Sequence, residues 1–323
     1  MISVICGVDV SSTFLDACIG RSGPTGRFAN NAAGIASLHE FCRMNQVEMV
    51  AMEATGGYEQ KAVVHLSDQE MFVAVLNPCS VRQFAKSMGR LEKSDAIDAR
   101  MIAWYAEIKQ PNPVTLAPQA QRHLRAMVTR LRQLTDVRTS QLNQQRLITD
   151  PLVQGTFAQM LGLLAKQIEM LEQNIAALID EDPLWNTVNL AMRSIKGVAD
   201  RTVARLMADL PELGTLSNKT ISKLAGLAPI MADSGKHKGK RVVQGGRSSI
   251  REILFVVASV VGRYEPDFIA FQQRLRDAGK PPKVVRIAVA HKLLVRLNAK
   301  ARDARAQMKV ASQKQTAPKT VAA

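Results

Sequence analysis

The stretch "ISVICGVDVSSTFLDACIGRSGPTGRFANN", residues 2–31, decides the fold of the first part of the chain. It opens with a β-branched run, and "FLDACIG" and "GRFANN" follow at the spacing of strands joined by hairpins. Two further apolar runs, "VEMVAMEAT" at 47–55 and "FVAVLNP" at 72–78, come later with helical stretches between them. Three adjacent strands followed by alternating strands and helices predict an α/β domain with a mixed sheet.

The length and composition of the chain limit the classes of protein to which it can belong. The chain has 323 residues, enough for two domains that each bury a core. It has no run of about 18 uncharged apolar residues and no basic N-terminal region followed by an apolar stretch, so we expect no membrane span and a cytoplasmic protein. The four cysteines lack C-x-x-C spacing. We predict that they are reduced core residues: Cys6, Cys18, Cys42 and Cys79.

Composition divides the chain into four segments. Residues 1–110 form the α/β domain, whose regular structure ends at a Pro-rich connector, "QPNPVTLAP". Residues 111–190 hold the connector and two long amphipathic helices. Residues 191–305 are predicted to form a mainly α domain. Residues 306–323 are rich in Ala, Lys, Gln and Thr, which favours a disordered basic tail.

The two middle helices carry apolar residues at spacings of three and four. These are Leu124, Met127, Leu131 and Leu134 in the first helix and Leu161, Leu164, Ile168 and Leu171 in the second. Two interpretations remain open. The helices form either a hairpin packed on its own domain or a coiled-coil arm that pairs two protomers.

The positive charge of the chain is concentrated in its last third. The net charge is +15, and residues 191–323 carry 26 Lys and Arg against 9 Asp and Glu. A polyanion is the natural partner of such a surface, because each neutralised phosphate releases condensed counterions. The sequence therefore indicates nucleic-acid binding.

Two local patterns in this basic part predict turns and caps. "IKGVADRTVARLMADL", residues 195–210, resembles a helix-hairpin-helix, whose turn amides grip a phosphate. Ser217 or Asn218 is the expected N-cap of the next helix. Ser248 and Ser249 are expected to cap the helix that begins before "IREILFVVASVV".

Four carboxylates stand out in the first domain. Asp9 lies within the first strand, and Glu53 ends the fourth strand before a Gly-Gly turn. Asp95 and Asp98 are three residues apart, which places them about 5–6 Å apart on one helical face. Because like charges at that distance repel, a divalent cation is the usual remedy, and carboxylate oxygens suit Mg²⁺ or Mn²⁺. Taken singly, each carboxylate also fits a structural role, as a turn residue, a capping acid or a solvated helix face.

The motifs "GVDVSS", "MEATGGY" and "KSDAIDAR" resemble the RuvC-like, ribonuclease-H-fold domain of the DEDD transposases of the insertion-sequence-110 family. The later "KLAGLAPIMADSGKHKGKRVVQGGRSSIREIL" resembles the C-terminal transposase domain of that family. The resemblance implies an α/β ribonuclease-H-like N-terminal domain, a helical coiled-coil middle and a mainly α C-terminal domain. It also implies that Asp9, Glu53, Asp95 and Asp98 are catalytic and bind the metal.

The resemblance assigns the nucleophile to Ser234, within "SGKHKG". A serine hydroxyl attacks phosphorus poorly unless its proton is removed or its oxyanion is stabilised, and cationic donors lower that barrier. The expected phosphate and nucleic-acid contacts are Lys236, Lys238, Lys240, Arg241, Arg247 and Arg251.

The implied activity is a Mg²⁺-dependent recombination of donor and target double-stranded DNA through a 5′-phosphoserine intermediate. The resemblance further implies a bridge RNA as guide, a homodimer or homotetramer in which the serine of one subunit meets the acidic cluster of another, and an association with the bacterial nucleoid. The main alternative is a metal-dependent endonuclease of the Holliday-junction type that uses water. A sugar-kinase or actin-like ATPase and a catalytically silent nucleic-acid scaffold are further alternatives.

Overall fold

A computed structural model gives the fold of residues 4–89, 95–230 and 242–316, with the backbone alone at 95–97, 230 and 311–316. The chain forms two compact units, Met1–Ala117 and Pro118–Ala323. No helix among the described residues is both long and apolar enough to cross a bilayer.

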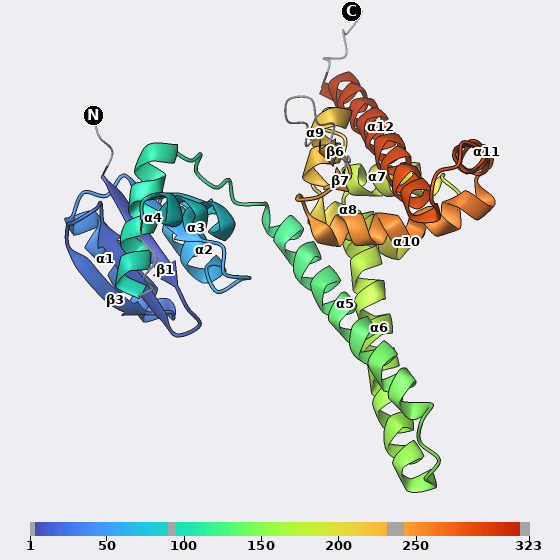
Figure 1. The fold of residues 1–323 in the computed structure, drawn as a ribbon, viewed down its shortest axis with the longest axis horizontal. Helices are drawn as coiled ribbons and strands as arrows, with labels where there is room; N and C mark the ends of the chain where they lie inside the picture. Colours follow the sequence, from blue (N-terminus) through green and yellow to red (C-terminus); the bar gives the residue numbers. More distant parts are fainter. Residues whose placement is uncertain (1–3, 90–94, 231–241, 317–323) are drawn as a thin grey trace, which may run out of the picture. The chain divides into compact units, whose positions relative to one another are not determined.

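The first unit is built on a five-stranded mixed sheet in the order β3-β2-β1-β4-β5 (Figure 1). Its strands are β1 (Ile5–Val10), β2 (Phe14–Ile19), β3 (Thr25–Ala29), β4 (Met49–Glu53) and β5 (Phe72–Leu76). β1, β2 and β3 pair antiparallel, whereas β1, β4 and β5 pair parallel. This topology confirms the predicted ribonuclease-H-like, RuvC-like α/β domain.

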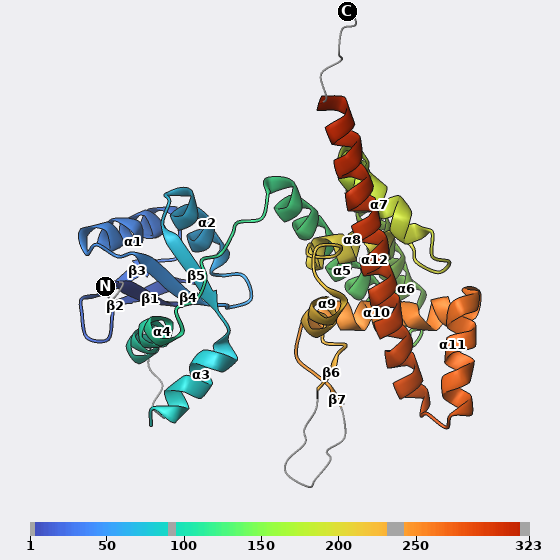
Figure 2. The ribbon, with the colours of Figure 1, turned by 90° about the horizontal axis from the view of Figure 1, so that it is seen from above.

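Helices cover both faces of this sheet. α1 (Ala32–Met44) and α2 (Gln60–Asp68) lie on one face, and α3 (Pro78–Ser87) and α4 (Asp95–Lys109) lie on the other (Figure 2). The period-2 pattern of β1 supplies both cores, because successive side chains point to opposite faces. Cys6 and Val8 belong to the core beneath α1 and α2, whereas Ile5 belongs to the core with Ile102 of α4.

The direction of α4 follows from its contacts with the start and middle of β1. A Cβ on Gly7 would lie 2.1 Å from the carbonyl oxygen of Ala99, so this helix sits directly on the glycine. The far end of α4 lies at the turn after β2, where the Nε atom of Arg21 is 2.7 Å from a carboxylate oxygen of Glu107. The amide of Gly20, in the same turn, donates to the carbonyl of Ile5. Hence α4 runs opposite to β1, and its first turn lies toward the carboxyl end of that strand.

The connector after α4 belongs to the first unit. The amide of Val114 donates to the carbonyl of Val73 in β5 at 2.7 Å, and the side chains of Val114 and Leu116 pack against the core beneath α1 and α2. The unit therefore ends at residue 117, whereas the composition of the sequence favours a boundary at residue 110.

The second unit is mainly helical, as expected, and has one short hairpin. Its elements are α5 (Gln119–Gln145), α6 (Pro151–Glu181), α7 (Pro183–Arg193), α8 (Asp200–Asp209), α9 (Asn218–Leu224), β6 (Pro229–Ile230), β7 (Val242–Val243), α10 (Ser248–Tyr264), α11 (Pro266–Asp277) and α12 (Pro282–Thr316). α5 and α6 form a long hairpin that projects from the other helices of this unit (Figure 1).

The base of the α5–α6 hairpin shares one core with the C-terminal helices. Leu131 of α5 and Ile168 of α6 belong to the same cluster of buried side chains as Leu206 of α8 and Leu297 of α12. The two long helices, which were predicted as part of the segment 111–190, therefore share a core with the C-terminal helices, whereas residues 111–117 belong to the first unit. At the turn between the two helices, Leu147 and Leu152 are exposed.

Three details differ from the sequence-based expectations. α12 continues to Thr316 through much of the predicted disordered tail, since Ala, Lys and Gln are good helix formers. Ser248 is the first residue of α10, and no side chain caps that helix. Cys79 is exposed, whereas the other three cysteines are buried and free, as predicted. The expected cap of α9 is Ser217, whose side chain accepts from the amide of Thr220.

Candidate functional site

Four charged residues form a row across the sheet of the first unit. Asp9 is paired with Asp16 in the β1–β2 register, and Asp16 is paired with Arg27 in the β2–β3 register. Glu53 extends the row on the other side of Asp9. The last residue pair between β1 and β4 is Val8 with Met52, and Asp9 and Glu53 are the next residues of their strands. Cross-strand partners point to the same face of a sheet, so these residues lie on the face that α4 covers. We call Arg27, Asp16, Asp9 and Glu53 the acidic row.

Asp16 and Arg27 neutralise each other at one end of the acidic row. The Nε and Nη2 atoms of Arg27 donate to the two carboxylate oxygens of Asp16 at 2.7 and 3.0 Å, a bidentate pair. The same guanidinium lies 5.3 Å from the ring centre of Phe14. Neither Asp16 nor Arg27 was predicted from the sequence as a site residue. The signal was the alternation in "FLDACIG", where Leu15 and Ala17 are buried and Asp16 must face the other side.

α4 adds its two predicted carboxylates near the same end of the sheet. Asp95 and Asp98 lie at the start of this helix, whose first turn lies toward the carboxyl end of β1, where Asp9 is found. Asp98 is half-buried and directly precedes Ala99, which packs on Gly7. The topology thus brings the start of α4, with Asp95 and Asp98, to the end of the sheet where Asp9 and Glu53 lie. We call these four residues the acidic edge. The side chain of Asp95 lies outside the described residues.

The donors on this edge suit a hard divalent cation by their chemistry, since carboxylate oxygens are the ligands that Mg²⁺ and Mn²⁺ prefer. The described side chains do not by themselves contain a group of three His, Cys, Asp or Glu residues that could hold an ion. A complete ligand set that includes Asp95 therefore stays a prediction.

A buried carboxylate braces the turn that follows Glu53. Glu59 is 5% exposed, and its Oε2 atom accepts from the amides of Thr55 at 3.2 Å and Gly57 at 2.9 Å and from the Thr55 hydroxyl at 2.9 Å. Burial alone would raise the pKa of Glu59, but hydrogen bonds from its own backbone, Gln60, Thr55 and Gly57 outweigh burial and lower it. Gly56 and Gly57 have φ values of 77° and 126°, which favour glycine. Sequence reasoning missed Glu59.

Asn30 ties this turn to the turn after β1. Its Nδ2 atom donates to the carbonyl of Ser11 at 2.8 Å and to the carbonyl of Tyr58 at 3.1 Å. Ser11 lies two residues after Asp9, and Tyr58 lies five residues after Glu53. The side chain of Asn30 therefore joins the loops that follow Asp9 and Glu53.

The predicted nucleophile and most of the predicted phosphate contacts lie outside the described residues. These are Ser234, Lys236, Lys238, Lys240 and Arg241. On either side of this segment β6 and β7 pair antiparallel, with Ile230 opposite Val242.

Arg247 and Arg251 follow β7, and both bond within the protein. Arg247 forms a bidentate pair with Glu212, with N···O distances of 2.6 and 2.7 Å, and donates to the carbonyl of Asp209 at 2.9 Å. Burial opposes ionisation of Glu212, but the hydrogen bonds from Arg247 outweigh burial and lower its pKa. Arg251 donates to the carbonyl of Gly245 at 2.7 Å. The two arginines hold the backbone after β7, and their contact with phosphate stays a prediction.

The turn between α7 and α8 is packed against α10. A Cβ on Gly197, whose φ is 93°, would lie 3.1 Å from a methyl carbon of Val260 and 3.2 Å from the amide nitrogen of Val261. The amide of Lys196 donates to a carboxylate oxygen of Glu265 at 3.3 Å. This turn resembles a helix-hairpin-helix in sequence, but a helix and a carboxylate of the protein occupy the side where such a turn would meet a phosphate.

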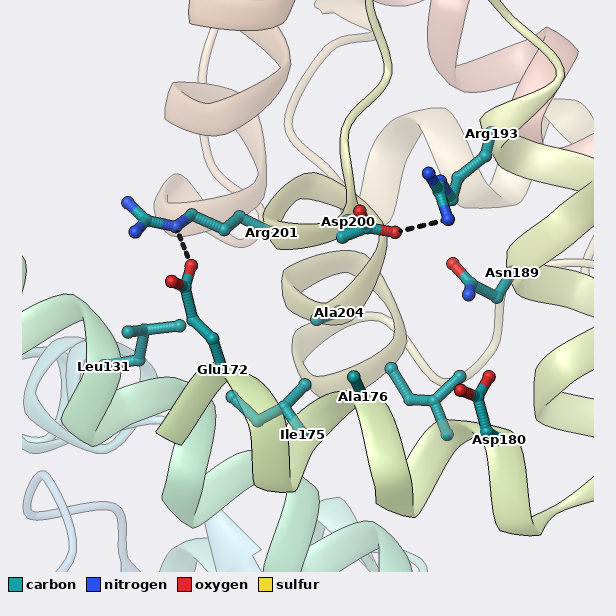
Figure 3. A pocket seen from close by; sticks show the side chains of 11 residues that line it. Leu131, Glu172, Ile175, Ala176, Asp180, Asn189, Arg193, Asp200, Arg201 and Ala204 are labelled. Atoms are coloured by element: carbon teal, nitrogen blue, oxygen red, sulfur yellow. Dashed lines mark hydrogen bonds and ion pairs between the residues drawn. The ribbon is translucent and has the colours of Figure 1, made fainter. Parts of the chain in front are cut away.

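A cavity of about 210 Å³ lies between α5, α6, α7 and α8 (Figure 3). Its floor is apolar, and its two arginines are already paired, Arg193 with Asp200 at 2.9 Å and Arg201 with Glu172. Because carboxylates engage both arginines, the cavity offers neither of these two cations to an anionic ligand.

Both halves of the chain match known protein families. Residues 6–150 match a transposase family of the DEDD, IS110 type, and residues 190–273 match the transposase IS116/IS110/IS902 family. The pilin gene-inverting proteins of Moraxella lacunata and Moraxella bovis are each 27% identical to this chain over 302 residues, which is 89% of this chain and 92% of each relative. The RuvC structure of Thermus thermophilus is similar at 18% identity and a TM-score of 0.25, over 34% of this chain and 99% of RuvC. With a sheet and two family segments in the expected order, the chain belongs to the IS110 family of transposases.

Proposed function

We propose that this transposase cuts and rejoins donor and target DNA through a composite site, in which the acidic edge of the first unit and Ser234 of the second act on one phosphate. The observation that carries the proposal is the position of Asp9 and Glu53, which follow the last β1–β4 pair on the face of the sheet covered by α4. Asp95 and Asp98 complete the proposed ligand set.

The acidic edge acts on the phosphodiester. Bound Mg²⁺, or Mn²⁺ in its place, would neutralise charge on the scissile phosphate and stabilise the leaving 3′ oxygen. Asp9 and Glu53 hold their carboxylates on neighbouring strands, whose backbone hydrogen bonds fix the separation. The Asp16–Arg27 pair removes one negative charge from the row, which limits repulsion of the DNA.

Ser234 supplies the nucleophile. Its oxygen loses a proton to solvent and bonds to phosphorus as the bond from phosphorus to the 3′ oxygen breaks; that oxygen takes up a proton from solvent, which leaves a 5′-phosphoserine and a free 3′ hydroxyl. The bond energy is retained in that ester, so the DNA can be rejoined to a second duplex without ATP. Lys236, Lys238, Lys240 and Arg241 supply positive charge beside the hydroxyl.

The proposed partners follow from charge and from the geometry of recombination. The excess of basic residues after position 191 suits phosphate-rich ligands, here two DNA duplexes and a bridge RNA that selects them by base pairing. Rejoining two duplexes requires several active sites at once, so a homodimer or homotetramer is expected. The exposed apolar side chains near the end of the α5–α6 hairpin are a candidate contact between protomers.

Ser234→Ala tests the nucleophile. We expect loss of strand exchange and of the covalent protein–DNA adduct, because no other hydroxyl takes its place. Ser248→Ala is the matched control, since Ser248 caps no helix and its variant should keep activity. Strand exchange and covalent adducts are measured on gels with supercoiled donor and target DNA. Normal cleavage by the Ser234→Ala protein would instead favour the endonuclease alternative, in which the acidic edge activates water.

Purification of the protein with its bound nucleic acid tests the guide. Sequencing of the recovered RNA should give one discrete species encoded beside the gene. A heterogeneous mixture of fragments would contradict guidance by a bridge RNA. The protein itself would then have to select the donor and target DNA.

A further inference from the structure

Tyr58 stands at the acidic edge as an exposed aromatic side chain. It is 55% exposed and follows the Gly56–Gly57 turn, five residues after Glu53. The chain has only three tyrosines, and Tyr105 packs against Phe84 in the core of the first unit. Single exposed apolar residues are common on protein surfaces, so exposure by itself assigns no role to Tyr58.

The backbone around Tyr58 is held from both sides, and this sets it apart from an ordinary surface residue. Its carbonyl accepts from Asn30, and Asn30 also binds the loop after Asp9. Its neighbour Glu59 is buried and accepts from the amides of Thr55 and Gly57. A buried carboxylate is costly unless it is fully hydrogen-bonded, so this turn is built to keep one conformation. That conformation leaves the ring of Tyr58 in solvent.

The charge of this edge favours an aromatic contact with nucleic acid. Asp9 and Glu53 are acidic residues, and carboxylates do not by themselves attract the phosphates of a DNA strand. An aromatic ring binds a nucleobase by stacking, which needs no cationic side chain and tolerates any base. An exposed ring on the loop after Glu53 would therefore add affinity for a DNA strand without a cationic side chain.

We infer that Tyr58 stacks on the nucleobase next to the phosphate held at the acidic edge, and that Glu59 and Asn30 are positioning residues for this contact. The inference rests on the proposed function, since it takes the acidic edge as the place where the phosphate is bound. It adds to that function a sequence-tolerant contact with an unpaired base of the DNA strand being cut.

Photocrosslinking identifies a stacked ring directly. The full-length protein, purified with its nucleic acid, is bound to donor and target duplexes in which 5-iododeoxyuridine replaces thymidine, irradiated in the near ultraviolet and mapped by mass spectrometry. We expect an adduct on Tyr58. Adducts on other exposed aromatic residues, such as Tyr264 of α10, with none on Tyr58, would overturn the inference.

Variants give an independent measure of the same contact. Loss of a base–aromatic stack is expected to lower the cleavage rate at subsaturating DNA about 5- to 150-fold in Tyr58→Ala. Tyr58→Phe keeps the ring and should stay within about twofold of the wild type. Phe72→Ala is the control. Phe72 is a 60% exposed aromatic residue at the amino end of β5, whereas Glu53 lies at the carboxyl end of the neighbouring strand β4. Wild-type rates in Tyr58→Ala would overturn the inference.

The positioning role is tested by a conservative pair at Glu59. Glu59→Gln keeps one oxygen that can accept from Thr55 and Gly57, so it should restore most of the cleavage that Glu59→Ala loses. Equal losses in both variants would contradict the role. Asp9→Asn distinguishes failure of the proposed function from failure of this inference. DNA cleavage by Asp9→Asn would contradict the proposed function. An inactive Asp9→Asn together with a fully active Tyr58→Ala would contradict only the stacking role of Tyr58.

Discussion

At the scale of single residues, the edge depends as much on its supporting side chains as on its carboxylates. Asp9 and Glu53 were found from the sequence because a charged residue inside or at the end of an apolar strand is unusual. Glu59 was not, because "GGYEQ" reads as an ordinary helix start. Its role depends on which amides the turn presents to it, and that is decided by the φ angles of Gly56 and Gly57. Asp16 was missed for a related reason, since its partner Arg27 lies on another strand.

The lowered pKa of Glu59 predicts a pH dependence of stability. The folded protein holds fewer protons at this site than the unfolded chain, so the stabilisation is complete above the ordinary value of 4.5 and is lost as the pH falls through the lowered folded pKa. The difference in unfolding free energy between wild type and Glu59→Gln, measured by urea titration from pH 2 to 7, should therefore shrink in acid. A difference that is constant over this range would contradict the prediction.

Gly7 allows α4 to lie on β1. Gly7→Ala places a methyl group 2.1 Å from the carbonyl of Ala99 and 2.4 Å from the amide of Ala103, so the helix must shift. We expect a loss of about 1–3 kcal/mol in unfolding free energy and a loss of cleavage. Gly162→Ala is the control: nothing lies within 4 Å of its new methyl, and a helical alanine gains up to about 1 kcal/mol. Unchanged stability in Gly7→Ala would refute the proposed close packing.

At the scale of elements, periodicity predicted the five strands and the long helices, but it did not fix how they pack. The apolar spacing of the middle helices fits a hairpin and a coiled-coil arm equally well, since both bury a similar stripe. The hairpin packs this stripe against α8 near its base, where Leu131 and Ile168 are buried. Its far end keeps Leu147 and Leu152 more than 80% exposed, at 84% and 82%.

This exposed end predicts the site of protomer contact. Leu147→Glu combined with Leu152→Glu should shift the protein from a dimer or tetramer to a monomer, because a charge at an apolar interface loses its hydration without gaining a partner. Leu190→Glu is the control, an exposed leucine on α7. Light scattering coupled to gel filtration measures the mass. An unchanged oligomer in the double variant would place the protomer contact elsewhere.

At the scale of the whole molecule, composition predicted four segments, whereas the contacts divide the chain into two compact units. A Pro-rich connector marks the end of regular structure, whereas the unit ends where the last side chains reach the core. Val114 and Leu116 pack against the core beneath α1 and α2. These contacts could not be predicted from composition, because the core is formed by segments that are far apart in the sequence. In the same way the tail from 306 was judged by composition, while its helix continues from the buried part of α12.

The boundary is testable with two fragments. Residues 1–117 should fold alone, and residues 1–110 should be less stable by about 2 kcal/mol or more, since they lack the two apolar side chains and the Val114–Val73 hydrogen bond. Thermal unfolding followed by circular dichroism makes the comparison. Equal melting temperatures would show that the connector adds nothing to the first unit.

The central claim is that the acidic edge and Ser234 act on the same phosphorus atom. The most direct test is mass spectrometry of the tryptic peptide that spans residues 224–236, after the protein has been quenched during reaction with donor and target DNA in Mg²⁺. We predict a nucleotide joined through a 5′-phosphate to Ser234 in the wild type and none in Asp9→Asn. A nucleotide on Ser234 in Asp9→Asn, or cleaved DNA with no nucleotide on Ser234 in the wild type, would contradict the account.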